Sequence, residues 1–203
     1  MKEYIKQIFS RTLSLFLVVI QYIPVVGPWF GIMLLPIILY FLTVLTVYPE
    51  FIIMELSLIF FSRRFIFGRV IVVAGLVIFL SAYFNFLKRA SPVVTDGLYS
   101  RVRHPQYLGL TTVTLGFTLM GIELRGDFKI LGMWLISLIG YILLAHYEEK
   151  CLLKEHYELY KQYMEKTPFM LPAASPKNFS EILFTVIFML GIALLCSLIV
   201  SIS

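Results

Sequence analysis

The chain has 203 residues, of which 60% are apolar and only 14% charged, and its formal net charge is +5. A soluble domain is about 45–50% apolar and about 25% charged, and a domain of this size buries only about 70% of its surface. So much apolar surface excludes a soluble two-layer enzyme, a secreted domain and a disordered chain. It predicts an integral membrane protein with several spans. The basic excess fits Lys and Arg that flank spans and face anionic membrane lipid, and we expect no nucleic-acid partner.

Residues 1–90 are predicted to form the N-terminal transmembrane helices. A nearly uncharged run is interrupted by Pro24, Gly27 and Pro28, which break a helix. A later apolar stretch is only twelve residues long, too short for a comfortable span, whereas the last one is a clear span. In chain order, the predicted pieces are 12–26, 29–47, 51–62 and 67–87.

Residues 91–178 are predicted to be the core of the protein, with a loop, a helical hairpin and an interfacial helix. The hairpin consists of 107–122 and 130–147 around the polar loop 123–129. Residues 179–203 form the C-terminal transmembrane helix, with its span at 181–202. No segment shows the alternation of a β-strand, so the predicted fold is all-α, a polytopic transmembrane bundle of five to seven helices.

Two polar stretches, 88–106 and 148–178, are separated by the two crossings of the hairpin. They therefore lie on one side of the membrane, and their basic excess makes that side the cytoplasm. The cluster Arg63, Arg64 and Arg69 then falls on the opposite side, against the positive-inside rule. A basic N-terminus on the cytoplasmic side requires an odd number of crossings before residue 63, and the sequence leaves open which pieces make them.

The first informative motif is the loop that precedes the hairpin. Pro105 suits the first turn of a helix, where its missing N–H is not needed, and a helix N-terminus favours an anionic group. His104 and Tyr107 are three residues apart and share one face. Gly109 allows a ligand or another backbone to approach closely. The same residues also fit a basic loop at the membrane surface that only caps a helix.

The second motif is Glu148-Glu149, at the predicted end of span 130–147. Two carboxylates there oppose the helix dipole and are costly to bury at the membrane edge. They need a cationic partner, which is Arg101, Arg103 or the cation of a ligand. A juxtamembrane salt bridge or a solvated face remains the alternative.

The helix after this pair carries Tyr157, Tyr160 and Tyr163, which on an interfacial helix normally form an aromatic belt. Pro168 and Pro172 end that helix. The sequence has no phosphate-binding glycine loop, no HExxH motif and no CxxC pair, and its three histidines lack metal-ligand spacing. We therefore expect no metal site.

Together these motifs resemble the superfamily of isoprenylcysteine carboxyl methyltransferases and phospholipid methyltransferases. The resemblance covers about 95–172 and rests on an Arg-His-Pro-x-Tyr-x-Gly run at 103–109, an acidic pair, and a leucine, two tyrosines and two prolines at the family spacing. The matching residues of this second part are Glu148, Glu149, Leu152, Tyr160, Tyr163, Pro168 and Pro172. The chain departs from the pattern at His156-Tyr157, where Phe-Gly is usual. It also lacks the arginine that prenylcysteine enzymes carry just upstream of the acidic pair.

The resemblance implies a multi-span membrane enzyme that uses S-adenosylmethionine in a pocket at the cytoplasmic face. The implied acceptor is a small lipophilic molecule from the bilayer, either prenylcysteine carboxylate-like or lipid-like. The expected catalytic residues are Arg103, His104 and Glu149. The expected cofactor-binding residues are His104, Tyr107, Leu108, Gly109, Glu148 and Glu149.

Elementary chemistry agrees with this cofactor. The acidic pair suits the ammonium of S-adenosylmethionine, a helix start with Arg101 or Arg103 suits its carboxylate, and Tyr107 suits adenine or the sulfonium. Two other functions remain open. One is an NADPH-dependent membrane reductase of the sterol-reductase type, whose loop is similar but whose 2′-phosphate the acidic pair would repel. The other is a membrane protein without enzymatic activity.

Overall fold

The computed structural model describes residues 27–48, 61–88, 91–172 and 180–202. The chain divides into two compact units, residues 1–35 and 36–203. In the first unit the described residues are the opening turns of one helix, and the second unit holds the candidate site. The predicted helix 12–26 and nearly all of the short apolar piece 51–62 lie outside the described residues, so the crossings before residue 63 stay open.

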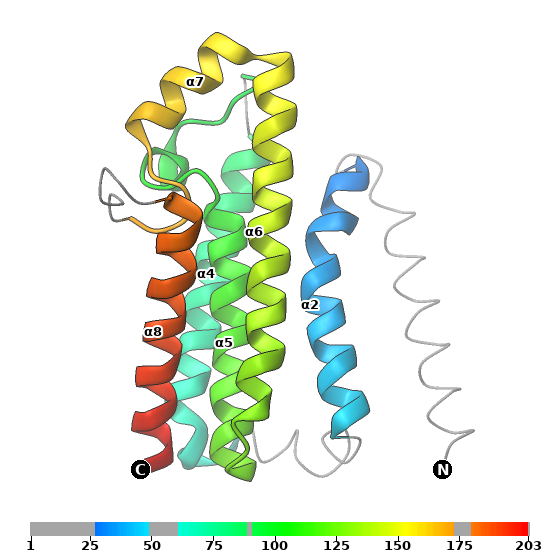
Figure 1. Cartoon of the computed structure of the whole chain (residues 1–203), viewed down its shortest axis with the longest axis vertical. Coiled ribbons are helices and arrows are strands. Elements are labelled where there is room, and N and C mark those ends of the chain that lie inside the picture. The colour runs from blue at the N-terminus through cyan, green and yellow to red at the C-terminus, as the bar shows by residue number, and fades with distance from the viewer. Residues whose placement is uncertain (1–26, 49–60, 89–90, 173–179, 203) are drawn as a thin grey trace, which may run out of the picture. The chain divides into compact units, whose positions relative to one another are not determined.

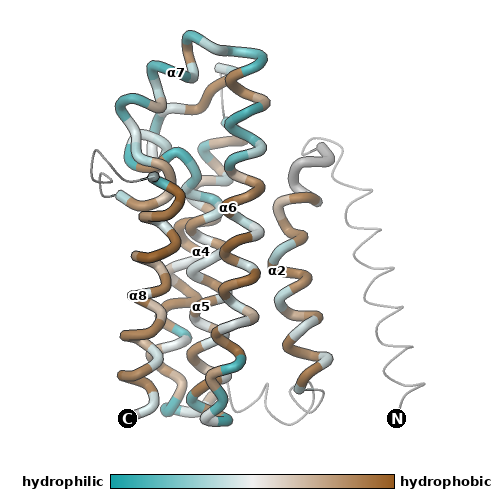
Figure 2. Tube along the Cα trace, viewed as in Figure 1, coloured by the Kyte–Doolittle hydropathy of each residue, from teal (hydrophilic) through white to brown (hydrophobic). Residues whose placement is uncertain are grey.

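The described residues form six α-helices and two short 3-10 turns, with no strand among them, which confirms the all-α prediction (Figure 1). The helices are α2 Gly27–Val47, α4 Ile66–Leu87, α5 Pro105–Arg125, α6 Lys129–Glu155, α7 Tyr157–Lys166 and α8 Glu181–Ile202, and the turns are η2 Arg63–Phe65 and η3 Gly97–Ser100. Four of them, α4 with its preceding turn, α5, α6 and α8, are long and apolar enough to cross a membrane. Figure 2 shows hydrophobic residues along these helices and hydrophilic ones gathered on α7.

Helix α5 is the central helix of the bundle. Within its apolar stretch 78% of the residues are buried, compared with 22% in α4 and in α8. Protein surrounds α5 instead of lipid, so it can carry polar side chains that bond within the bundle. Trp134 of α6 donates from Nε1 to the Thr111 carbonyl at 3.1 Å, and the hydroxyls of Tyr40 and Thr118 lie 2.8 Å apart.

Helices α4 and α5 pack backbone to backbone along a seam of glycines. A Cβ at Gly75 would lie 2.8 Å from the Gly109 carbonyl oxygen, and a Cβ at Gly116 would lie 2.7 Å from that of Gly68. The glycines are seven residues apart on each helix, so the two contacts lie two turns apart on antiparallel helices. Small residues allow the two backbones to approach this closely. The resulting van der Waals contact stabilises helix association in a bilayer, where the hydrophobic effect does not favour it.

The hairpin turn lies at the end of the bundle where α4 begins. Helix α5 ends at Gly126, whose φ of +66° favours glycine, and its N–H caps the Ile122 carbonyl. Arg64, just before α4, pairs with Glu123 at 3.5 Å. Glu123 is a buried residue inside α5 and not part of the loop, so the turn is shorter than predicted. The contact confirms that the arginines near residue 63 share one end with the hairpin turn.

Helix α6 is longer than the predicted span 130–147. It continues to Glu155, so Glu148 and Glu149 lie almost two turns before its end. The prediction that they sit at a helix C-terminus was therefore wrong, because the dipole acts mainly within the last turn. The need for a cationic partner remains, since the side chain of Glu149 is only 7% exposed.

Candidate functional site

The candidate site lies at the opposite end of the bundle from the hairpin turn. There the loop before α5 runs beside the segment that follows α7. The backbone N–H of Arg103 donates to the Pro168 carbonyl at 2.9 Å, and that of His104 donates to the Phe169 carbonyl at 3.2 Å. These two bonds fix the loop, and Pro105 then begins α5 as its first residue, as predicted.

Arg103 ties four parts of the chain together. Its Nε lies 2.8 Å from Oε1 of Glu149, and its Nη2 lies 2.5 Å from Oε2 of Glu181. Its Nη1 donates to the carbonyls of Thr167 and Met164 at 2.9 and 3.1 Å. The side chain is only 2% exposed, and all three nitrogens contact protein acceptors. Arg103 is thus a cationic partner of the acidic pair, which it contacts through Glu149.

His104 lies between the two carboxylates of the acidic pair. Its Nε2 is 3.2 Å from Oε1 of Glu149, and its Nδ1 is 3.6 Å from Oε2 of Glu148. Burial by itself lowers the pKa of an imidazole, but the two carboxylates outweigh it, and the pKa of His104 lies above its ordinary value. His104 therefore carries a proton more readily than a histidine in water.

Tyr107 forms the wall beside His104. The two rings are stacked with centroids 5.6 Å apart, and Tyr107 also packs against Tyr141 of α6 at 5.8 Å. The prediction that His104 and Tyr107 share a face is confirmed. Leu108, the next residue, is partly buried.

Gly109 lies on another face of α5. A Cβ there would come within 2.6 Å of the Phe79 amide nitrogen and 2.9 Å of the Gly75 carbonyl oxygen, both on α4. The close approach that the sequence predicted is therefore made by a backbone. A contact of Gly109 with a cofactor stays a prediction.

The two adjacent glutamates have different surroundings. Glu149 contacts Arg103 and His104, and the Tyr160 hydroxyl donates to its Oε1 at 3.4 Å. Oε2 of Glu148 is also shielded from solvent, yet it has no hydrogen-bond partner among the described residues. Neighbouring residues on a helix differ by about 100° in direction, which is why the carboxylate of Glu149 faces Arg103 and that of Glu148 lies beside Nδ1 of His104.

The structure adds residues that the sequence analysis did not assign to the site. Tyr160 is buried against Glu149, and Tyr163 donates from its hydroxyl to the Tyr99 carbonyl at 2.7 Å. The aromatic-belt interpretation was therefore wrong for these two and fits only exposed Tyr157. Both buried tyrosines belong to the matched spacing, which was the available signal. No sequence signal marked Phe169 or Glu181.

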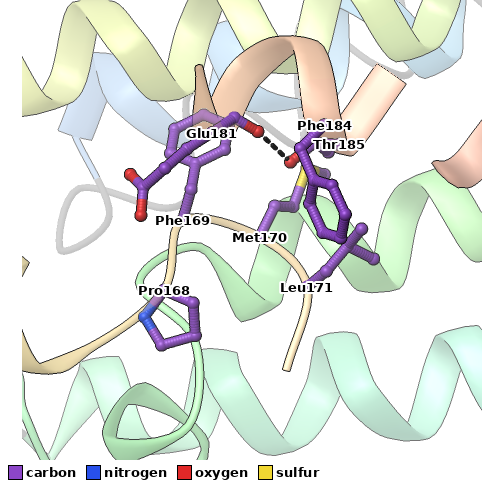
Figure 3. Close-up of a pocket in the computed structure, with 7 residues that line it drawn as sticks. All are labelled: Pro168, Phe169, Met170, Leu171, Glu181, Phe184 and Thr185. Carbon is purple, nitrogen blue, oxygen red and sulfur yellow. Dashed lines mark hydrogen bonds between the residues drawn. The ribbon is translucent and has the colours of Figure 1, made fainter. Parts of the chain in front are cut away.

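A shallow pocket opens beside this cluster, between the segment after α7 and the first turn of α8. Its lining residues are Pro168, Phe169, Met170, Leu171, Glu181, Phe184 and Thr185 (Figure 3). Its cavity volume is about 10 Å³, far below the roughly 300–1,000 Å³ of typical small-molecule sites. This pocket alone is too small for a nucleoside cofactor.

Comparison with known proteins finds one matching family. Residues 63–159 match the family model of the phospholipid methyltransferases. This segment is similar to that family. The match covers just under half of the chain and confirms the resemblance to the superfamily of integral membrane methyltransferases. No match was found among curated proteins or among solved structures.

The family segment runs from the turn before α4 to the first residues of α7. It contains Arg103, His104 and the acidic pair, together with three of the four apolar helices. The chain is accordingly an integral membrane protein with a methyltransferase core. Tyr160, Phe169 and Glu181 complete the cluster from beyond the segment.

Proposed function

We propose that the protein is an S-adenosylmethionine-dependent methyltransferase whose acceptor is a small lipophilic molecule from the bilayer. One observation carries the proposal. The buried Oε2 of Glu148, without a hydrogen-bond partner among the described residues, faces His104 in a segment of a methyltransferase family. A buried carboxylate oxygen without a partner is costly, and a cation offsets that cost.

The donor set fits this cofactor. Glu148 would hold the ammonium, and Tyr107 beside it would face the sulfonium or the adenine. The first turn of α5 presents backbone N–H groups that suit the carboxylate. Arg103 already contacts two carboxylates and two carbonyls, so exposed Arg101 is the better partner for that carboxylate. When bound, the cofactor supplies an electrophilic methyl group.

The same contacts bear on the acceptor. Every nitrogen of Arg103 already contacts a protein acceptor, so this side chain is not free to turn toward an acceptor carboxylate. A lipid-like acceptor without a free carboxylate therefore fits better than a prenylcysteine carboxylate. If the acceptor is an amine or a thiol, its proton must leave before or during transfer. Glu149 is paired with Arg103, so the proposed base is His104, which must first lose the proton that its raised pKa favours.

The site is also proposed to face the cytoplasm, because the two polar stretches that form it carry the basic excess of this part of the chain. The alternative of an NADPH-dependent reductase is disfavoured by charge. Glu149 and Glu181 contact the guanidinium of Arg103, and Glu148 lies beside the imidazole of His104, so three carboxylates gather at the site. They would repel the 2′-phosphate of that cofactor and attract the ammonium of S-adenosylmethionine.

The test is thermal unfolding of the detergent-purified protein with S-adenosylhomocysteine or NADPH. A ligand at a hundred times its Kd stabilises the folded state by about 2.7 kcal/mol, so S-adenosylhomocysteine should raise the unfolding temperature and NADPH should not. Stabilisation by NADPH alone would support the reductase, and stabilisation by neither would favour a non-enzymatic protein. Tritium from labelled S-adenosylmethionine should then appear in organic-extractable product.

A further inference from the structure

We propose that Glu181, the first residue of α8, is a positioning residue of the site. It gives a net negative charge to the charged cluster, which consists of Arg103, His104, Glu148, Glu149 and Glu181, and this charge attracts a cationic cofactor. The inference rests on the proposed function, because the cation in question is that of S-adenosylmethionine. It goes beyond the family, since residue 181 lies outside the matched segment 63–159. Helix α8 would then be part of the working site as well as a membrane span.

The contact is direct and partly shielded. Oε2 of Glu181 lies 2.5 Å from Nη2 of Arg103, whose side chain is 2% exposed, while that of Glu181 is 39% exposed. Figure 3 shows Glu181 in the first turn of α8, beside Phe169. A carboxylate at the start of a helix is also favoured by the helix dipole. Glu181 is therefore held on the solvent side of a buried guanidinium.

The charges explain what this contact does. Three carboxylates, those of Glu148, Glu149 and Glu181, meet the guanidinium of Arg103 and the imidazole of His104. With His104 protonated, the cluster keeps one negative charge. Without Glu181, the two carboxylates of the acidic pair would be balanced by Arg103 and His104, and no net charge would remain for a cofactor cation.

Glu181 is not needed to hold Arg103 in place. Nη1 of Arg103 is anchored by the carbonyls of Thr167 and Met164, and its Nε by Glu149. Replacing Glu181 by glutamine should consequently change the charge of the cluster more than its geometry. Charge and structure can therefore be separated by experiment.

The experiment compares Glu181→Gln with Glu158→Gln, which removes the same charge from an exposed position on α7. The Kd for S-adenosylhomocysteine is measured by calorimetry on the full chain in neutral detergent at low and high salt. We expect Glu181→Gln to raise the Kd about three- to ten-fold, the order of one partly screened charge interaction. Its affinity should depend less on salt than that of the wild type, Glu158→Gln should match the wild type, and Glu181→Asp should recover most of the affinity.

A second measurement needs no ligand. The titration of His104 is followed by NMR in histidine-labelled protein, assigned with His146→Gln and His156→Gln. The groups that face His104 are Glu148 and Glu149 of α6, Arg103 of its own loop and Tyr107 of α5. Loss of a negative charge next to Arg103 should move the His104 midpoint to lower pH in Glu181→Gln but not in Glu158→Gln.

The outcomes separate the two proposals. Wild-type protein that fails to bind S-adenosylhomocysteine overturns the proposed cofactor, while an altered His104 titration in Glu181→Gln would still show that Glu181 sets the charge of the cluster. Wild-type affinity, salt dependence and His104 midpoint in Glu181→Gln would overturn the role of Glu181. If Glu181→Gln does not fold, Glu181→Ser, which also removes the charge, replaces it, with the same rise in Kd expected and a wild-type Kd contradicting the proposal.

Discussion

The Nε atom of Arg103 lies 2.8 Å from Oε1 of Glu149, whereas Oε2 of the adjacent Glu148 lies 3.6 Å from Nδ1 of His104, beyond hydrogen-bond distance. Two neighbouring carboxylates of one motif therefore have different tasks. Glu149 contributes to the internal charge balance of the bundle, and Glu148 is the one that we propose contacts a ligand. This difference can be measured.

Glu148→Gln should weaken binding of S-adenosylhomocysteine by about 1–3 kcal/mol, the range for a lost charge-assisted hydrogen bond, and should destabilise the fold less than Glu149→Gln does. Glu149→Gln should lower the free energy of unfolding by about 1–3 kcal/mol, because it weakens the neutralisation of a buried guanidinium. Calorimetry and denaturant unfolding in detergent measure the two effects, with Glu158→Gln as control. Unchanged binding in the double variant would remove the acidic pair from the cofactor site.

The glycine seam between α4 and α5 predicts that substitutions of two glycines differ in their effect on stability. Gly75→Val should destabilise the bundle by about 1–3 kcal/mol, because its side chain would meet the backbone of Val113 and Gly109. Gly132→Ala on α6, where a Cβ would meet nothing within 4 Å, should leave stability equal or slightly higher. The unfolding temperature of each variant in detergent measures both effects. Equal stability of the two variants would argue against close packing at the seam.

The raised pKa of His104 predicts how stability depends on pH. Burial lowers the pKa of His104, but Glu148 and Glu149 raise it by more than burial lowers it. The pKa in the folded state therefore lies above the ordinary 6.5. The protonated imidazole therefore stabilises the folded state fully below about pH 6.5, and this contribution is lost as pH rises through the folded value. Unfolding temperatures from pH 5.5 to 9 should fall more steeply in the wild type than in His104→Gln. Parallel curves would contradict the prediction.

The topology predicts which loops a membrane-impermeant thiol reagent can reach. Single cysteines at Asp96, Glu165 and Lys129, introduced after Cys151 and Cys196 are replaced by serine, test the two faces of the membrane. The first two positions lie at the site end and should be labelled only in lysed cells, because we expect that end in the cytoplasm. Lys129 begins α6 at the hairpin end and should be labelled in intact cells. Equal labelling at all three positions would refute the predicted arrangement.

Much of the fold could be predicted because helix formation and membrane insertion depend on local composition. The span 181–202 coincides with α8, 67–87 begins one residue after α4, and Pro105 begins α5 as its ring geometry requires. The need of Glu149 for a cation also followed from the sequence, because an unpaired carboxylate at the membrane edge is costly wherever the chain places it. Hydropathy could not set the end of α6, because that helix continues past the apolar stretch into polar residues.

Only the tertiary structure decided which groups meet at the site. Arg103 and Glu181 are 78 positions apart and touch because the loop before α5 and the start of α8 lie at the same end of the bundle. Glu148 and Glu149 look equivalent in sequence, but successive residues on a helix point about 100° apart and so face different neighbours. The sequence alone determined that a membrane bundle would carry an acidic pair in need of a cation. Packing determined that Arg103 contacts one carboxylate of the pair, that of Glu149, and that the other, that of Glu148, lies beside His104.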